Sequence, residues 1–291
     1  MTMFEGFRLE HVDVGDVTLR VRTGGSGPPL LLLHGHPQTH VMWHRVAPVL
    51  AERFTLVLPD LRGYGESSKP PTTEDHAPYS KRAMARDLVG LMEQLGHDSY
   101  GVVGHDRGGR VSYRLALDHP ERVERLAVLD IVPTADMWRF AERSGKRFGL
   151  IEYHWYFLAM PNGLPERVIT PAPSAYYFTE RRERFDPAAL ADYERCVANP
   201  ETVHAMCEDY RAGAGIDDEI DEGDRAAGRR VQCPVLALWS GRDELGEWFD
   251  VLDTWRGWAD DVTGHAVDAG HYLAEEAPEE VATALIDFLD R

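Results

Sequence analysis

Cysteine is scarce in the 291-residue sequence, and this scarcity argues against two kinds of structure. Cys196, Cys207 and Cys233 are the only cysteines, and none lies in a Cys-x-x-Cys pair or a Cys/His cluster. An odd, scattered set of thiols argues against a disulfide framework, and its spacing argues against a structural zinc site. We therefore expect reduced thiols in a cytoplasmic protein.

Long apolar runs are also missing from the sequence. No window approaches the roughly 18 apolar residues that indicate a membrane-spanning helix. The N-terminal segment MTMFEGFRLEH lacks the charged and then apolar pattern of a signal peptide. The sequence thus predicts no association with a membrane.

Positive charge is the third shortage. The chain carries 31 Lys and Arg against 49 Asp and Glu, which gives a formal net charge of −18. An acidic protein repels nucleic acids and anionic membranes, so we expect neither as a partner. Solubility is the commonest reason for such a charge. If the substrate is a small anion, however, a local group of positive side chains has to hold it against the overall repulsion.

Short apolar runs alternate with helical patterns along most of the chain. Continuous apolar runs are typical of strands buried on both faces of a parallel sheet, and their alternation with helices indicates that helices cover both faces. The stretches 7–14 and 17–23 flank a Gly-Asp turn and predict an antiparallel hairpin at the start. The expected buried strands are 28–35, 54–60, 100–106, 125–131 and 233–239, and the expected helices include 40–53, 81–96, 109–123 and 278–290.

The pattern changes between residues 133 and 230. Buried-strand runs disappear there, and aromatic and charged residues mix at helical spacing, as in WRFAERSGKRFGLIEYHWYFLAM. Pieces rich in Pro and Gly, such as MPNGLP and TPAPSAY, separate the helical segments. We therefore expect a core domain formed by residues 1–132 and 231–291, with a helical cap domain inserted at 133–230.

The stretch GVVGHDRGG places Asp106 where many hydrolases carry a serine nucleophile. A buried run precedes it and a helical pattern follows. Gly104 and Gly108 allow the sharp turn that raises the central side chain above the edge of the sheet. Aspartate is also a common helix N-cap, but the Gly-x-Asp-x-Gly setting favours a nucleophile, and a carboxylate is already ionised at neutral pH.

A carboxylate that attacks carbon forms an ester, and hydrolysis of that ester requires a base. His271 lies on a loop between an expected last short strand, 266–270, and the C-terminal helix, where hydrolases of this architecture place their histidine. The acid that orients the imidazole is either Asp130 or Asp243, each at the end of an expected strand. Both strand ends lie at the carboxyl edge of the sheet, so spacing does not choose between them.

The sequence resembles the α/β-hydrolase fold superfamily over nearly its whole length. The segments LLLHGHPQTHVMWHRVAPVL and PDLRGYGESSKP carry this resemblance. It implies a mainly parallel sheet of the eight-stranded type, with helices on both faces and a helical cap. Within the superfamily the chain is similar to the fluoroacetate dehalogenases, through GHDRGGR, HWYF and EDYRAG. Haloalkane dehalogenases and epoxide hydrolases of similar fold usually carry tryptophan or another apolar residue where Arg107 stands.

This resemblance implies roles for the site residues. Asp106 would be the nucleophile, His271 the base, and Asp130 the third member of the triad. Arg107 and Arg110 are three residues apart, so they can share one helix face and bind the carboxylate of a 2-haloacid.

Aromatic residues of the expected cap would form the halide site. The resemblance implies three hydrogen-bond donors for the departing halide, namely His154, Trp155 and Tyr210. The neighbouring aromatic residues are expected to pack in the core, namely Tyr153, Tyr156 and Phe157.

The expected reaction has two steps. Asp106 attacks C2 of a haloacetate such as fluoroacetate and expels halide, and water activated by His271 then hydrolyses the ester to release glycolate. The backbone N–H groups of His36 and Arg107 would stabilise the oxyanion. The family often has phenylalanine where this chain has His36. The resemblance therefore does not determine the shape of the pocket. The scheme needs no metal or organic cofactor, and capped hydrolases of this kind are commonly homodimers.

Two other functions stay open at this point. An epoxide hydrolase uses the same nucleophile but needs a pair of cap tyrosines to protonate the epoxide oxygen, which Tyr210 with Tyr153 or Tyr156 could provide. A small-molecule receptor of this superfamily would bind a ligand without turnover. The two arginines favour a substrate with a carboxylate, and the chemically competent triad favours catalysis.

Overall fold

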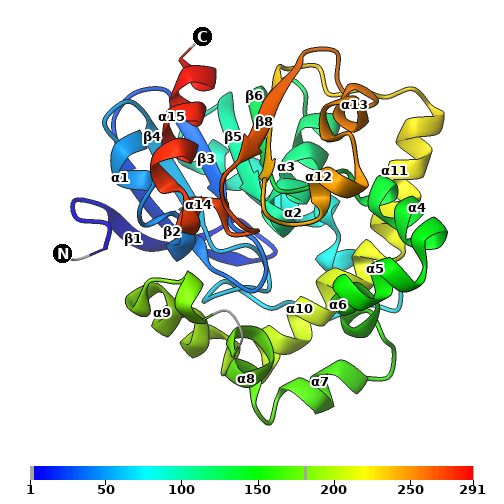
Figure 1. Cartoon of the computed structure of the whole chain (residues 1–291). Helices are drawn as coiled ribbons and strands as arrows, with labels where there is room; N and C mark the ends of the chain where they lie inside the picture. Colours follow the sequence, from blue (N-terminus) through cyan, green and yellow to red (C-terminus); the bar gives the residue numbers. More distant parts are fainter. Residues whose placement is uncertain (1–2, 180–181, 291) are drawn as a thin grey trace.

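A single sheet organises the computed structural model, which describes residues 3–179 and 182–290 (Figure 1). Over these residues its eight strands follow the order β1-β2-β4-β3-β5-β6-β7-β8. Pairings of β1 with β2 and of β2 with β4 are antiparallel, and the others are parallel. The strands are β1 (Arg8–Asp13), β2 (Thr18–Gly25), β3 (Pro29–Leu33), β4 (Thr55–Pro59), β5 (Tyr100–His105), β6 (Val123–Leu129), β7 (Val235–Ser240) and β8 (Val262–Val267). The mainly parallel sheet with an antiparallel start, expected from the sequence, is confirmed.

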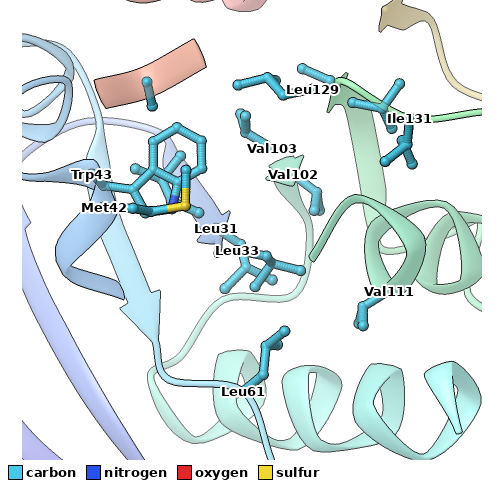
Figure 2. Packing of buried hydrophobic residues seen from close by; sticks show 14 of the residues in the cluster. Leu31, Leu33, Met42, Trp43, Leu61, Val102, Val103, Val111, Leu129 and Ile131 are labelled. Atoms are coloured by element: carbon cyan, nitrogen blue, oxygen red, sulfur yellow. The ribbon is translucent and has the colours of Figure 1, made fainter. Parts of the chain in front are cut away.

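The central strands are buried because apolar side chains occupy both of their faces. Leu31 and Leu33 of β3 lie in one core cluster with Val102, Val103 and Leu129 of the neighbouring strands (Figure 2). Complete burial of one such side chain stabilises the fold by about 1.5–3 kcal/mol. The parallel register of β3, β5 and β6 brings the residues after each strand to the same edge of the sheet.

The core helices flank the sheet (Figure 1). One expected helix, over 40–53, is wrong: the chain forms a 3-10 turn and then a separate one-turn helix. Pro48 explains the break, because proline has no N–H and its ring clashes with the carbonyl four residues earlier. The core helices are η1 (His40–Trp43), α1 (Ala47–Leu50), η2 (Ala77–Tyr79), α2 (Lys81–Gln94), α3 (Asp106–Asp118), α12 (Leu245–Trp248), α13 (Val251–Arg256), α14 (Leu273–Glu276) and α15 (Pro278–Leu289).

The described residues between β6 and β7 form helices joined by short turns and loops. Figure 1 shows its helices, coloured green to yellow, grouped on the side of the molecule away from α1 and α15. They are α4 (Thr134–Ser144), α5 (Lys146–Ile151), α6 (Tyr153–Leu158), α7 (Leu164–Ile169), α8 (Pro173–Phe178), η3 (Arg182–Arg184), α9 (Pro187–Val197), α10 (Pro200–Gly213) and α11 (Ile216–Ala226). Residues 180–181 of the expected cap, and 1, 2 and 291 of the expected core, lie outside the described residues. Every helix in the described part of the chain is too short or too polar to span a lipid bilayer.

Candidate active site

Asp106 lies at the turn between β5 and α3, and its backbone has a left-handed conformation that residues other than glycine rarely adopt. Its φ is 47°, and the left-handed region costs an L-residue roughly 1–2 kcal/mol. A Cβ at Gly104 would lie 2.2 Å from Ser112 Oγ, and one at Gly108 would lie 2.4 Å from the carbonyl oxygen of His34. Only glycine fits at these two positions, so the sequence forms the sharp strand-to-helix turn that it predicts.

The loop after β3 brings a backbone donor to the Asp106 carboxylate. The N–H of His36 donates to Asp106 Oδ1 over 2.7 Å. Gly35 permits this approach, because a Cβ there would lie 2.6 Å from the Cβ of Asp106. The N–H of Arg107 belongs to the first turn of α3, where backbone donors have no intrahelical acceptor. Of the two N–H groups predicted for the oxyanion, that of His36 bonds the Asp106 carboxylate, and that of Arg107 belongs to the residue directly after Asp106.

The loop after β8 brings His271 to Asp130. His271 Nδ1 lies 2.7 Å from Asp130 Oδ2, and the N–H of Ser240 donates to Asp130 Oδ1 over 2.8 Å. The N–H of Asp243, the alternative acid, instead donates to Ser240 Oγ over 2.8 Å. Asp130 comes directly after β6, and Asp243 lies beyond the end of β7, so both acids follow strands that end at the carboxyl edge of the sheet. The hydrogen bond to His271 shows that Asp130 is the acid that meets the histidine.

Neighbouring charges keep both reactive groups ionised. Burial disfavours the Asp106 carboxylate, but the positive charges of His271 and Arg107 outweigh burial and hold its pKa well below the usual range. Burial likewise opposes the His271 cation, but the hydrogen bond and charge of Asp130, with the charge of Asp106, raise its pKa to about 9. At neutral pH the resting site is therefore a carboxylate beside an imidazolium.

His105 is a neighbour of the site that the sequence analysis did not single out. Its Nε2 donates to the carbonyl oxygen of His271 over 2.7 Å, and the two ring centroids are 4.7 Å apart. Burial and the adjacent imidazolium lower the pKa of His105 to about 4, so its ring is neutral at pH 7. The hydrogen bond holds the backbone of the loop that carries His271 against the turn that carries Asp106. Its place directly before Asp106 is the one sequence signal that could have indicated it.

Arg107 and Arg110 are both buried in the first turns of α3, yet their partners differ in charge. Arg107 forms a two-point ion pair with Asp209, from Nε to Oδ2 and from Nη2 to Oδ1, each over 2.9 Å. Arg110 Nη1 donates to the carbonyl of Val132 over 3.1 Å and to Thr134 Oγ1 over 3.2 Å. Within residues 3–179 and 182–290, no carboxylate forms a salt bridge with Arg110. The sequence analysis identified both arginines but missed Asp209, although EDYRAG contains it.

The inserted helices bring three aromatic side chains to the two arginines. His154 and Trp155 of α6 face Tyr210 of α10, with ring centroids 5.6 and 6.3 Å from the tyrosine ring. The guanidinium carbon of Arg107 lies 4.2 Å from the Tyr210 ring centroid, and that of Arg110 lies 4.6 Å from the Trp155 ring centroid. Burial and a neighbouring carboxylate raise the pKa of Tyr210, so its phenol stays protonated and can donate a hydrogen bond.

Two other aromatic residues of α6 do not pack as expected. Tyr153 and Tyr156 are 50% and 44% exposed, so the expectation that they lie in the core is wrong. Trp155 and Leu158, three residues apart, form the buried face of this short helix, which turns the two tyrosines toward solvent. Phe157 is partly buried and packs against the core as expected.

Among the side chains that the structure describes, one group away from Asp106 could offer ligands to a metal. Glu166, His204 and Glu208 place ligand atoms within 4.8 Å of one another. Arg211 Nη1 donates to both Glu166 and Glu208, each over 2.7 Å. The guanidinium thus already supplies the positive charge between the two acids.

The order of the sheet and the turn that carries Asp106 define the class of the protein. The chain belongs to the alpha/beta hydrolase fold family, whose model matches residues 28–278, and it is a hydrolase of that fold. Among individual proteins it is similar to the fluoroacetate dehalogenase of a Burkholderia species, with 45% identity over 99% of this chain and 95% of that protein. It is also similar to the soluble epoxide hydrolase of a Corynebacterium species, with 34% identity over 98% of this chain and 95% of that protein. A solved structure from a Nostoc species, described as a candidate alpha/beta hydrolase, matches with a TM-score of 0.95 and 49% identity over 99% of both chains.

Proposed function

We propose that this chain is a hydrolytic dehalogenase of small 2-haloacids, which converts fluoroacetate or another haloacetate to glycolate and halide. The observation that carries the proposal is Arg110, a buried cation beside Asp106 whose described partners are the neutral Val132 carbonyl and Thr134 hydroxyl. A buried cation without an acid partner is costly, and the carboxylate of a substrate would compensate it. The similarity to a fluoroacetate dehalogenase supports the same substrate class.

In the first step, a carboxylate oxygen of Asp106 attacks C2 of the substrate. The new C–O bond forms as the C–halogen bond breaks, and the halide leaves with the bonding electrons. Fluoride is a poor leaving group, so its departure needs donors directed at the developing charge. His154, Trp155 and Tyr210 offer an imidazole N–H, an indole N–H and a phenol O–H for this purpose.

In the second step, water hydrolyses the ester. Esterification removes the negative charge of Asp106, which is one cause of the raised pKa of His271, so that pKa falls and neutral imidazole becomes available. His271, oriented by Asp130, takes a proton from water as the water oxygen attacks the Asp106 carbonyl carbon. The N–H of His36 would stabilise the oxyanion. The tetrahedral intermediate then collapses as its C–O bond to glycolate breaks, the glycolate oxygen takes the proton of the added hydroxyl group, and the Asp106 carboxylate and the His271 cation are regenerated. The proton that His271 released to solvent after esterification is the acid formed together with the halide.

A single turnover in heavy-oxygen water, with enzyme in excess, tests the covalent route. If the ester forms on Asp106, the oxygen transferred to the first glycolate comes from the protein, so this glycolate is unlabelled while Asp106 gains the label. Repeated turnover in the same water provides the control, because later glycolate molecules then carry label. Label in the first glycolate would mean that water attacks the substrate directly, and the scheme would be rejected.

An epoxide hydrolase is the second candidate, because the protonated Tyr210 phenol could donate to an epoxide oxygen. Tyr153 and Tyr156 are half-exposed, so the second donor would be His154 rather than a tyrosine. An epoxide has no carboxylate to pair with Arg110. Comparison of kcat/KM for fluoroacetate and styrene oxide separates the two, and a preference for styrene oxide would reject the haloacid. Halide release under saturating fluoroacetate would also exclude a receptor without turnover.

A further inference from the structure

Asp209 is a buried carboxylate at which four hydrogen-bond donors converge. It lies on α10, while the donors come from the core: Arg107 through Nε and Nη2, Tyr64 through its hydroxyl over 2.6 Å, and Lys81 through Nζ. Burial opposes the ionised form, but the charges of Arg107 and Lys81 outweigh it and hold the pKa of Asp209 below its usual range. Both carboxylate oxygens are therefore saturated by donors, and the side chain is held rigidly.

This arrangement leaves one nitrogen of the Arg107 guanidinium, Nη1, without a hydrogen-bond partner among the described residues. Nε and one N–H of Nη2 bond the Asp209 carboxylate, and Nη2 also donates to the Asp209 carbonyl oxygen over 2.8 Å. Among the described residues, Nη1 is buried and has no hydrogen-bond partner. Gly213 makes room for the guanidinium, because a Cβ there would lie 2.9 Å from Arg107 Nη2.

The charges around Asp209 also balance. Lys81 Nζ pairs with Asp217 Oδ2 over 3.0 Å as well as with Asp209. Two cations, Arg107 and Lys81, thus face two anions. Arg110 is outside this balanced group, and its described partners carry no charge. The two arginines that a substrate carboxylate would meet are therefore not equivalent: Arg107 is hydrogen-bonded to a carboxylate, whereas Arg110 is hydrogen-bonded only to neutral groups among the described residues.

We propose that Asp209 is a positioning residue for substrate binding. It locks the Arg107 guanidinium so that only Nη1 can bond the substrate carboxylate, while Arg110, whose described hydrogen-bond partners are neutral, supplies a second positive charge. This inference rests on the proposed function, since it assigns Asp209 a part in binding the carboxylate of the same haloacid substrate. Asp209 touches no substrate; it acts through Arg107.

A double-mutant cycle tests this role, with Asp209→Asn, Arg107→Gln and the double variant beside the wild type. Two properties are measured: kcat/KM for fluoroacetate and the calorimetric affinity for acetate, an unreactive carboxylate. In the Asp209→Asn variant, an NH₂ group replaces one of the two oxygens that accept these hydrogen bonds. The Arg107 guanidinium then loses its two-point ion pair and can change its position. We expect Asp209→Asn alone to weaken acetate binding and kcat/KM by about 10- to 100-fold, mainly through KM. In the Arg107→Gln background, the same change should cost less than about twofold.

A purely structural role would give a different result. The cost of Asp209→Asn would then be the same with and without Arg107, and a further loss above about fivefold in the Gln background would overturn the proposal. If Asp209→Asn does not fold alone, the comparison of Arg107→Gln with the double variant still decides, because Arg107, through which Asp209 is proposed to act, is absent from both.

The matched control is Asp221→Asn. Asp221 is also a buried acid on an inserted helix, and it pairs with Arg114 of α3 and accepts from Tyr113 over 2.6 Å. Its substitution should lower stability and leave KM unchanged. Failure of the proposed function is seen separately, as absence of halide release from fluoroacetate by the wild type, and the acetate titrations then still decide the role of Asp209.

Discussion

At the scale of single residues, the site depends on two ions that stabilise each other. The His271 cation holds the pKa of Asp106 below its usual range, and the Asp106 anion is one cause that raises the pKa of His271 to about 9. Each step of the proposed reaction changes one of these charges. In the proposed scheme, esterification would neutralise Asp106 and lower the pKa of His271, which favours the neutral imidazole that the second step needs.

Replacement of His271 by Gln should separate the two steps. Asp106 can still be alkylated, but the ester has no base to hydrolyse it, so we expect one halide per active site followed by a stop. The steady-state kcat should fall by about 1,000-fold or more. Mass spectrometry of the Asp106 peptide should show one added carboxymethyl group. Asp106→Asn is the control and should give neither halide nor adduct, and continued turnover by the His271 variant would contradict the scheme.

The pH dependence should follow the same histidine. We expect kcat/KM for fluoroacetate to be level near neutral pH and to fall above pH 9, since the pKa of His271 is about 9 and its deprotonation removes a positive charge beside an anionic substrate. Because this pKa lies above its ordinary value, the stability that the protonated ring contributes is also lost as pH rises through 9.

The variant Asp130→Asn checks the assignment, because it removes the largest favourable causes of the raised pKa of His271. Its loss of activity should begin at a lower pH than in the wild type. Initial rates of halide release across the pH range measure both profiles, and identical profiles would disprove the assignment.

At the scale of elements, Glu275 connects the inserted helices to the loops of the site. It lies on α14, just after His271, and is buried. Tyr193 of α9 donates to Glu275 Oε1 over 2.5 Å, and Gln38 of the loop after β3 donates to the same oxygen over 3.3 Å. His44 Nδ1 lies 3.8 Å from the other oxygen. Three separate segments therefore meet at one carboxyl group.

Glu275→Gln should change stability in a pH-dependent way. Burial and the charge of Asp186 raise the pKa of Glu275 to about 8, against the opposing effects of Tyr193 and Arg45. The wild type therefore loses stability as pH rises from the ordinary pKa of a glutamate to about 8, by at most about 1.4 kcal/mol per pH unit from this group. We expect the Gln variant to gain stability relative to the wild type between pH 6 and pH 9, as measured by urea unfolding.

The exposed Glu280 on α15 supplies the control for this comparison. Glu280→Gln should differ from the wild type by the same small amount at every pH. If Glu275→Gln behaved in the same way, Glu275 would be ionised throughout this range and the explanation would be incorrect.

At the scale of the whole molecule, the net charge of −18 opposes the proposed substrate. The overall field repels an anion, whereas the buried Arg110 attracts it at short range. Salt screens the long-range part most strongly, since the Debye length falls from about 30 Å at 0.01 M to about 8 Å at 0.15 M ionic strength. Salt should therefore weaken the long-range repulsion between the protein and an anionic substrate more than the short-range attraction of the substrate to Arg110.

We expect added sodium sulfate to raise kcat/KM for fluoroacetate by about two- to fivefold between these ionic strengths. Styrene oxide, which is neutral, provides the comparison if it reacts, and its kcat/KM should not change. Halide salts are avoided because they are products of the reaction. A fall in kcat/KM with salt would show that the local positive charge dominates the encounter.

The sequence alone determined what depends on neighbouring residues. Apolar runs identify buried strands, the helical spacing after β6 identifies the inserted helices, and Gly104 and Gly108 around Asp106 identify the turn. Local steric and hydrophobic rules suffice for each of these, because every contributing residue lies within a few positions of the others. The break in the expected helix 40–53 shows the limit even there, since one proline outweighed the apolar pattern.

Only the tertiary structure decided what depends on distant contacts. Asp130 rather than Asp243 meets His271, and this contact between residues 141 positions apart is not revealed by spacing along the chain. Arg107 and Asp209 are 102 positions apart, so the residues next to either of them do not predict the ion pair. Tyr153 is exposed because α6 packs through the face that carries Trp155 and Leu158. The sequence determines the chemistry of each side chain. The packing of the strands and the inserted helices determines which side chains share a buried site.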